Sequence, residues 1–293
     1  MTTRKLSHPS PRGGRRAARK TGGAARKVRA SSSRSRRKGR SARRGGGGRW
    51  WALSVGGLLS LSLLLSLLWL FVRPLFWMGG ERTEADLADY NVRGIDISHW
   101  QPHVDWQRLQ QDSVNGFPIR FVIVKSTEGT DRRDHRFPEY ITRARRANFI
   151  VGAYHFFRPE QDAEQQAQFY LQNTALQSGD LPAILDVEVR GDKPLQQFHG
   201  DVLTWLRTVE AATGRPPILY TGVAFKQQYL RDEHFDAYPF WAAHYNGRRS
   251  PRYRGKWVLW QYTDQGTVSG VQGPVDLNVF NGKIQDLRAL CLP

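Results

Sequence analysis

The amino-acid sequence predicts an α/β fold: an irregular TIM-like barrel of five βα units followed by three strands without helices, preceded by a single transmembrane helix. Strand-like and helix-length segments alternate between residues 94 and 230, and the later strand-like segments are separated by stretches rich in Gly, Arg, Pro and Ser. An uncharged leucine-rich stretch near the N-terminus predicts the membrane helix. A plain open parallel sheet is the alternative to the barrel.

Apolar segments bounded by turn residues predict the first five strands, Gly94–Ser98, Phe121–Thr127, Ile150–Phe157, Ala183–Glu188 and Pro217–Gly222. Helix-length segments follow each of them, at Trp106–Val114, Pro138–Asn148, Asp162–Leu176, Leu195–Thr213 and Ala224–Leu230. Parallel strands need such long crossovers, so this alternation favours a parallel sheet. The last three strands are predicted at Phe240–Tyr245, Val258–Thr263 and Val275–Phe280, with no amphipathic helix between them.

Residues 1–49 form a basic tail that we expect to be disordered. They hold 18 of the 44 Lys and Arg residues and no Asp or Glu, so the rest of the chain is formally neutral. The tail has almost no large apolar side chains to offset the entropy of ordering. We expect its partners to be anionic lipid or nucleic acid, whereas the charge balance gives the folded part no general affinity for nucleic acid.

Residues 50–72 form the predicted signal anchor, because Trp50–Val72 carries no charge and is long enough to cross a bilayer. Its basic flank lies on the N-terminal side, so the positive-inside rule places the tail in the cytoplasm and the remainder outside. A cleaved signal peptide is the alternative, although no clear cleavage site follows. A linker at 73–91 then leads to a domain at 92–290. Cys291 is the only cysteine, so no intramolecular disulfide can form.

Polar side chains recur where the predicted strands end, which is how barrel enzymes assemble their sites. Asp186-Val187-Glu188 is the most informative of these segments, because it ends an apolar run that reads as a core strand. Residues two apart on a strand share a face, roughly 6.6 Å apart along the chain. Paired carboxyl groups at such a spacing suit the acid-catalysed cleavage of a glycosidic bond. The alternative is that one acid caps a helix and the other forms an ion pair.

Six segments resemble glycoside hydrolase family 25, the Chalaropsis-type lysozymes, in the order and spacing of that family between residues 92 and 282. They are Gly94-Ile95-Asp96-Ile97-Ser98-His99-Trp100-Gln101, Phe121-Val122-Ile123-Val124-Lys125-Ser126-Thr127-Glu128-Gly129, Val151-Gly152-Ala153-Tyr154-His155-Phe156, Leu185-Asp186-Val187-Glu188, Leu259-Trp260-Gln261-Tyr262 and Val275-Asp276-Leu277-Asn278. The resemblance implies the irregular barrel and an N-acetylmuramidase that hydrolyses the β-1,4 bond between N-acetylmuramic acid and N-acetylglucosamine. The segment from Gly129 to Phe137 is unusually basic.

The resemblance also implies roles for four acids. Glu188 corresponds to the general acid, and Asp186, Asp96 and Asp276 correspond to the family's catalytic aspartates. We expect like charges to raise the pKa of Glu188 and so keep it protonated. Asp186 is expected to orient the substrate's 2-acetamido group, which then attacks the anomeric carbon. In the competing mechanism one of the aspartates is a direct nucleophile or a base for water. No cofactor or metal is expected.

We expect further strand-end residues to bind the substrate, with aromatic rings stacking on sugar faces and Lys125 pairing with the acid cluster. These residues are Tyr154, His155, Lys125, Tyr220, Trp241, Trp260, Gln261, Tyr262 and Asn278. Barrel-end aromatics are often simply core, which is the alternative for each ring. The sequence therefore predicts a monomeric lysozyme on the bacterial cytoplasmic (inner) membrane, with its catalytic domain in the periplasm or on the outer face. A catalytically inactive, tethered peptidoglycan-binding module is the alternative.

Overall fold

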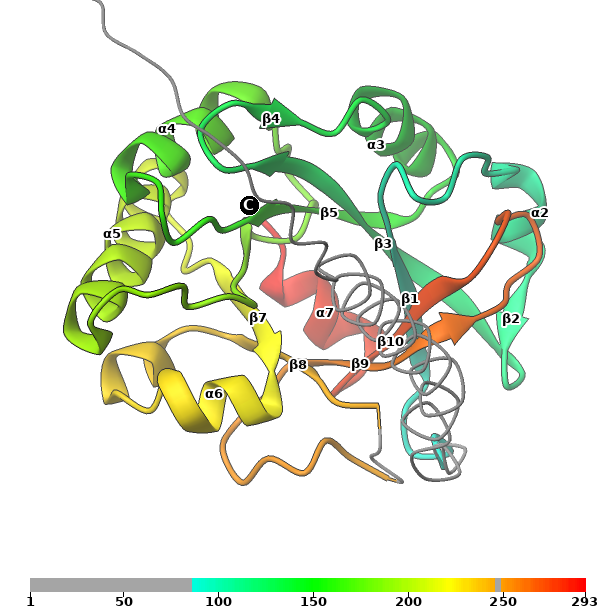
Figure 1. Cartoon of the computed structure of the whole chain (residues 1–293). Coiled ribbons are helices and arrows are strands. Elements are labelled where there is room, and N and C mark those ends of the chain that lie inside the picture. The colour runs from blue at the N-terminus through cyan, green and yellow to red at the C-terminus, as the bar shows by residue number, and fades with distance from the viewer. Residues whose placement is uncertain (1–85, 246–248) are drawn as a thin grey trace, which may run out of the picture. The chain divides into compact units, whose positions relative to one another are not determined.

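A computed structural model describes residues 86–245 and 249–293 of the chain (Figure 1). The predicted tail at 1–49, the predicted anchor at 50–72 and most of the predicted linker at 73–91 lie outside these residues. Within the described ranges, no helix has both the length and the apolar character needed to cross a membrane.

Eight strands close into a barrel, in the order β1-β3-β5-β6-β7-β8-β9-β10 and back to β1. All neighbours are parallel except β10, which runs antiparallel to both β9 and β1. The predicted barrel is therefore confirmed, and each predicted strand is present with small changes at its ends. The strands are β1 (Val92–Ile97), β3 (Phe117–Glu128), β5 (Ile150–Phe156), β6 (Ile184–Asp186), β7 (Ile218–Gly222), β8 (Phe240–Ala243), β9 (Leu259–Gly266) and β10 (Val275–Phe280).

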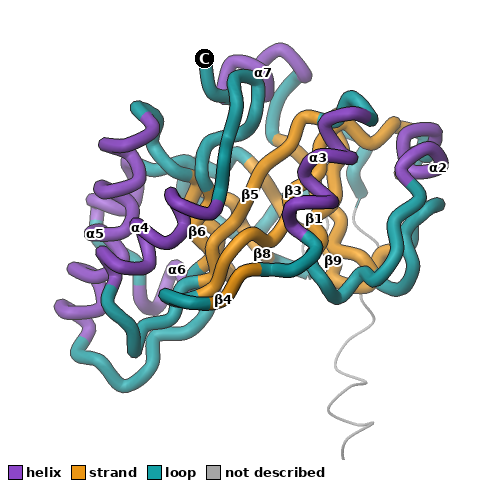
Figure 2. Tube along the Cα trace, turned by 90° about the horizontal axis from the view of Figure 1, so that it is seen from above, coloured by secondary structure: helices purple, strands orange, loops and turns teal. Residues whose placement is uncertain are grey.

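Five helices follow the first five barrel strands, as the alternation predicts, and lie outside the strands (Figure 2). They are α2 (Trp106–Gln111), α3 (Phe137–Arg146), α4 (Ala163–Asn173), α5 (Leu195–Thr213) and α6 (Val223–Tyr229). Aspartate side chains start two of them: Asp105 accepts from the backbone N–H of Arg108, and Asp162 accepts from that of Gln165. Between β8 and β10 the described residues contain no helix.

Four short elements were not predicted: β2 (Ser113–Val114), β4 (Arg132–Arg133), a 3₁₀ helix η1 (Glu233–Ala237) and the C-terminal α7 (Ile284–Leu290). The helix expected to reach Val114 ends at Gln111. Asn115 and Gly116 then adopt positive φ angles of 52° and 79°, and β2 pairs with the start of β3. This is the Asn-Gly hairpin turn, whose two left-handed residues match the twist of the paired strands.

Strand alternation divides the side chains between the barrel interior and an outer layer under the helices. The interior contains an apolar cluster that includes Ile123, Ile184 and Trp241, and it lies below the polar ends of the strands. A separate outer cluster packs Leu185 and Leu219 against α4 and α5. Adjacent residues on one strand therefore enter different environments.

Candidate active site

A pocket of about 130 Å³ opens at the carboxyl ends of the parallel strands, above the apolar barrel interior. Four carboxyl groups face it together with aromatic and amide side chains. Its lining is Asp96, Tyr154, Asp186, Glu188, Tyr220, Trp241, Tyr245, Gln261 and Asp276. All four predicted catalytic acids are therefore brought to one pocket, at the end of the barrel where α/β enzymes place their sites.

Asp186 and Glu188 reach this pocket because the chain leaves β6 between its two neighbouring strands. The backbone oxygen of Asp186 accepts from the N–H of Phe157 at 2.9 Å, and the N–H of Val187 donates to the oxygen of Tyr220 at 3.0 Å. Asp186 is buried, and its Oδ1 has no hydrogen-bond partner. Glu188 lies one step further out, accessible to solvent at the mouth but with protein on most sides of its carboxyl group.

Asp96 is the most heavily hydrogen-bonded of the four acids. Its Oδ2 accepts from Nε2 of Gln261 at 2.9 Å and from Nδ2 of Asn278 at 2.7 Å. Asp276 is hydrogen-bonded to it as well. An amide N–H can only donate, so these contacts favour the charged form of Asp96 and assign the shared proton to Asp276.

The two amides are themselves held in one orientation. Oε1 of Gln261 accepts from the hydroxyl groups of Tyr220 at 2.9 Å and Tyr245 at 2.7 Å. Oδ1 of Asn278 accepts from the indole N–H of Trp241 at 2.9 Å. Because the amide oxygens are occupied by donors, the amide nitrogens must point at Asp96.

The pKa values of all four carboxyl groups are raised. Burial, followed by the charge of Asp96, raises the pKa of Asp276 to about 9. Burial also raises the pKa of Asp96, although its three hydrogen bonds oppose the shift. Burial and the neighbouring Glu188 raise that of Asp186 well above its usual range. For Glu188, burial raises the pKa, the neighbouring hydroxyl group of Tyr220 lowers it, and the charge of Asp96 raises it.

This arrangement can supply a proton at a solvent-accessible position and negative charge below it. Glu188 is the only one of the four acids on an exposed residue, and its raised pKa favours the protonated form. Asp96 lies deeper with the donors that support its charge. A protonated carboxyl group beside a charged one is the pairing that glycosidic bond cleavage requires.

The structure places the predicted substrate-binding residues in three groups. Tyr154, Tyr220, Trp241 and Gln261 line the pocket. Two others lie beside it: Asn278 behind Asp96, and Lys125 at the rim, where its Nζ is 2.7 Å from Glu128.

The third group, His155, Trp260 and Tyr262, does not line the pocket. His155 is buried outside the barrel, where it hydrogen-bonds to Thr127 Oγ1 at 2.8 Å and stacks on Trp205 at 5.5 Å. Its burial lowers its pKa to about 4. Trp260 donates its indole N–H to the oxygen of His244 at 2.8 Å and packs beside Tyr262.

Tyr245 lines the pocket and is not among the substrate-binding residues predicted from the sequence. The available signal was the period of two along the predicted strand Phe240–Tyr245, which places Tyr245 on the same face as Trp241. The strand ends at Ala243, and Tyr245 nevertheless turns its hydroxyl group toward Gln261.

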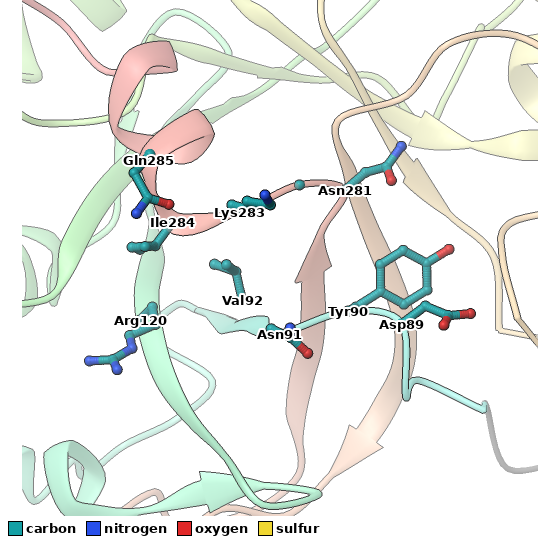
Figure 3. A pocket seen from close by; sticks show the side chains of 10 residues that line it. Asp89, Tyr90, Asn91, Val92, Arg120, Asn281, Lys283, Ile284 and Gln285 are labelled. Carbon is teal, nitrogen blue, oxygen red and sulfur yellow. The ribbon is translucent and has the colours of Figure 1, made fainter.

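A larger cavity of about 510 Å³ lies where β1 and β3 begin and α7 starts, at the opposite end of the barrel (Figure 3). Its charged lining residues are Asp89, Arg120 and Lys283, and it contains no pair of carboxyl groups. It therefore lacks the acid chemistry of the first pocket. Among the described residues, no cluster of three or more His, Cys, Asp or Glu side chains is arranged to hold a metal ion.

Comparison with known proteins agrees with this geometry. Residues 95–271 match the family described as Glycosyl hydrolases family 25. The chain belongs to this family. The match includes Asp96, Asp186 and Glu188 and ends just before Asp276, so the predicted family and enzyme class, a glycoside hydrolase of the muramidase type, are confirmed.

Individual relatives cover the barrel domain. YegX of Escherichia coli K12 is 41% identical over 202 residues, which are 69% of this chain and 74% of YegX. Lysozyme M1 of Streptomyces globisporus is 34% identical over 226 residues, covering 72% of this chain and 74% of the lysozyme. The crystal structure of the bacterial lysozyme from Streptomyces coelicolor superposes with a TM-score of 0.61 at 32% identity, covering 69% of this chain and 97% of that one.

Proposed function

We propose that this protein is a membrane-anchored peptidoglycan hydrolase that cleaves the β-1,4 bond between N-acetylmuramic acid and N-acetylglucosamine. One observation carries the proposal: Glu188 is open to solvent, has a raised pKa and lines the same pocket as the hydrogen-bonded Asp96 in a family 25 barrel. A general acid must hold its proton near the working pH and reach the leaving oxygen. The substrate follows from the relatives that are named lysozymes.

In the proposed first step, Glu188 donates its proton to the glycosidic oxygen as the bond to the anomeric carbon breaks. The unpaired Oδ1 of Asp186 accepts the N–H of the 2-acetamido group, and the acetamido oxygen forms the new bond to the anomeric carbon. Water then attacks that carbon as its bond to the acetamido oxygen breaks, and the proton that the water loses passes to Glu188. The substrate N–H favours the charged form of Asp186, against the effect of its burial.

Asp96 and Asp276 act on this pair from below. The charge of Asp96 raises the pKa of Glu188, and Asp276 holds a proton on the far side of Asp96. A mechanism in which Asp186 attacks the sugar directly is the competing route. A trapped covalent bond between the sugar and Asp186 would establish that route and contradict the acetamido-assisted one.

The anchor is proposed from the sequence alone. The uncharged stretch at 50–72 follows a tail with 18 basic residues and no acids, so the tail faces the cytoplasm and the barrel faces the cell wall. The enzyme would then cut wall within reach of its linker. We expect the full-length chain to sediment with membranes and to be released by detergent but not by high salt. Release by salt alone would contradict an anchor.

The function is tested by digesting purified peptidoglycan with the full-length chain and its Glu188→Gln variant. Mass spectrometry of the new reducing ends should show muramic acid with the wild type and not with the variant. Glu233→Gln is the matched control, because Glu233 is exposed on η1 and does not line the pocket. Reducing-end glucosamine would overturn the bond assignment. Binding without cleavage would favour a tethered binding module.

A further inference from the structure

A second cleft, of about 740 Å³, opens beside the catalytic pocket on the same end of the barrel. Lys125, Phe156 and Trp100 are among its lining residues. It adjoins the pocket through the strands: Lys125 pairs with Tyr154 in the sheet, and Phe156 pairs with Asp186. The charge of Lys125 also acts on the pKa values of both Asp186 and Glu188. A substrate in the pocket therefore extends into this cleft if it continues toward β3.

Three cations in the cleft surround a single carboxylate. Glu128 accepts from Nζ of Lys125 at 2.7 Å, from Nη1 of Arg132 at 2.9 Å, and from Nε of Arg158 at 2.9 Å. Burial favours the neutral form of Glu128, but the hydrogen bonds and charges of Lys125 and Arg158 outweigh it and lower the pKa of Glu128 to about 2. Glu128 stays charged and neutralises one of these three cations. Over the whole lining, which also holds Arg133, Asp131 and Asp134, four Lys and Arg side chains meet three Asp and Glu side chains, so the formal balance is positive by one.

The two guanidinium groups are more accessible than the carboxylate that they meet. The side chain of Arg132 is 67% exposed and that of Arg158 is 32% exposed, against 13% for Glu128. Asp134 is fully buried and is held by the backbone and ring nitrogens of His99. Asp131 is the one exposed acid in the lining. A ligand that enters the cleft therefore meets guanidinium groups first, and these bind carboxylates in paired contacts.

An exposed tryptophan forms the apolar part of the same cleft. Trp100 is 77% exposed, although most large apolar side chains of the described residues are buried. Its ring lies 4.8 Å from that of His99, which Asp134 holds at 2.7 Å. The indole ring of Trp100 thus packs against His99 on one side and is otherwise exposed to solvent. An exposed indole ring beside a catalytic pocket offers a flat apolar surface with a polar edge to a bound ligand.

We propose that this cleft binds the peptide stem that peptidoglycan carries on its muramic acid, with stem carboxylates on Arg132 and Arg158 and apolar stem atoms against Trp100. The inference rests on the proposed function and deepens it: the enzyme prefers peptide-bearing glycan over bare glycan. Arg132 determines this preference and takes no part in the bond cleavage itself. Its exposed ion pair with Glu128 contributes little to stability, so replacing it leaves the fold intact.

The test compares kcat/KM of the full-length chain on soluble glycan chains with intact stems and on the same chains after an amidase has removed the stems. We expect Arg132→Glu to lower kcat/KM about tenfold on the peptide-bearing chains and less than about twofold on the bare chains. Added salt should reduce the wild-type preference. Arg146→Glu is the control of equal charge change, because Arg146 is exposed on α3 and lines a different groove.

Equal activity of Arg132→Glu and wild type on peptide-bearing chains would overturn the inference, and so would an equal loss on both substrates. A binding measurement separates this failure from failure of the proposed function. The Glu188→Gln variant is titrated with a disaccharide–peptide and with the bare disaccharide, with and without Arg132→Glu. Weaker binding of only the peptide form in the double variant supports the stem site even if the wild type cleaves neither substrate. Unchanged binding refutes it.

Discussion

The inward and outward faces of the same barrel strands differ in what they do with polar groups. On β5, Tyr154 faces the catalytic pocket, while its neighbour His155 is buried outside, hydrogen-bonded to Thr127. On β9, Gln261 contacts Asp96 from the inside, while Trp260 packs in the outer layer. One residue along the chain separates a group in the site from a group that holds the fold together.

The electrostatic contrast is as sharp. The inner face collects four carboxyl groups with raised pKa values, including Asp186 with an unpaired buried oxygen. On the outer face, burial instead keeps His155 neutral, with a pKa lowered to about 4. Burying acids together costs free energy that a purely structural face has no reason to spend. The comparison therefore separates residues whose loss should cost activity from residues whose loss should cost stability.

The largest effect is expected at β6, where Asp186 and Leu185 are adjacent and face opposite ways. Asp186→Asn should lower kcat by about 100-fold or more, because the amide cannot supply a negative charge to the acetamido group. It should leave stability unchanged or raised, since it removes a buried acid. Leu185→Ala should instead lower the free energy of unfolding by about 2–5 kcal/mol through a cavity in the outer layer. The kcat of its folded fraction should equal that of the wild type.

These outcomes are read from turnover per folded molecule and from urea unfolding followed by tryptophan fluorescence. Leu185→Ala losing as much kcat as Asp186→Asn would break the contrast between the faces. An Asp186→Asn variant with wild-type turnover would show that Asp186 has no role in the reaction. The first step would then need only Glu188 as acid and water as nucleophile.

Much of this division could be predicted from the sequence, but one part could not. The strand-end positions of Asp96, Asp186 and Glu188 followed from motifs whose spacing is fixed by the covalent chain. The alternation of side chains along a strand also predicts which residues share a face. It does not say which face points into the barrel unless the side of one residue is already known. The sequence predicts His155 and Trp260 as substrate-binding residues together with their inward neighbours, because polar and aromatic side chains occur on both faces. The register between strands, which sequence spacing does not determine, decides which of them meets the acids.

A smaller pair of effects is expected on β5. His155→Leu should destabilise the protein by about 1–3 kcal/mol, because Thr127 loses its partner in a buried environment. The kcat/KM of the folded enzyme should not change. Tyr154→Phe should do the reverse: it should lower kcat/KM about fivefold, the effect of one lost hydrogen bond to substrate, at nearly constant stability. Thermal unfolding and steady-state rates on one preparation test both. If His155→Leu shifts KM alone, His155 is a substrate contact.

The last effect is a change in how stability depends on pH. The pKa of Asp276 rises from 3.8 to about 9 in the folded protein, through burial and the charge of Asp96. Between these values the folded state holds a proton that the unfolded chain has released, so this stabilisation is complete below about pH 4 and disappears as the pH rises toward 9. Asp276→Asn keeps a donor for Asp96 but cannot titrate. Its free energy of unfolding should therefore fall less steeply between pH 5 and about 9 than that of the wild type.

Leu185→Ala is the control for this slope, because it lowers stability without removing a titratable group. The free energy of unfolding of Leu185→Ala should be lower than that of the wild type at every pH, and it should change with pH at the same slope. If the free energy of unfolding of Asp276→Asn also changes with pH at the wild-type slope, the proton shared with Asp96 does not reside on Asp276. Asp96 would then be the neutral member of the pair, and it could not be the charge that raises the pKa of Glu188. The pH dependence of Asp276→Asn thus tests whether Asp96 carries the charge that raises the pKa of Glu188.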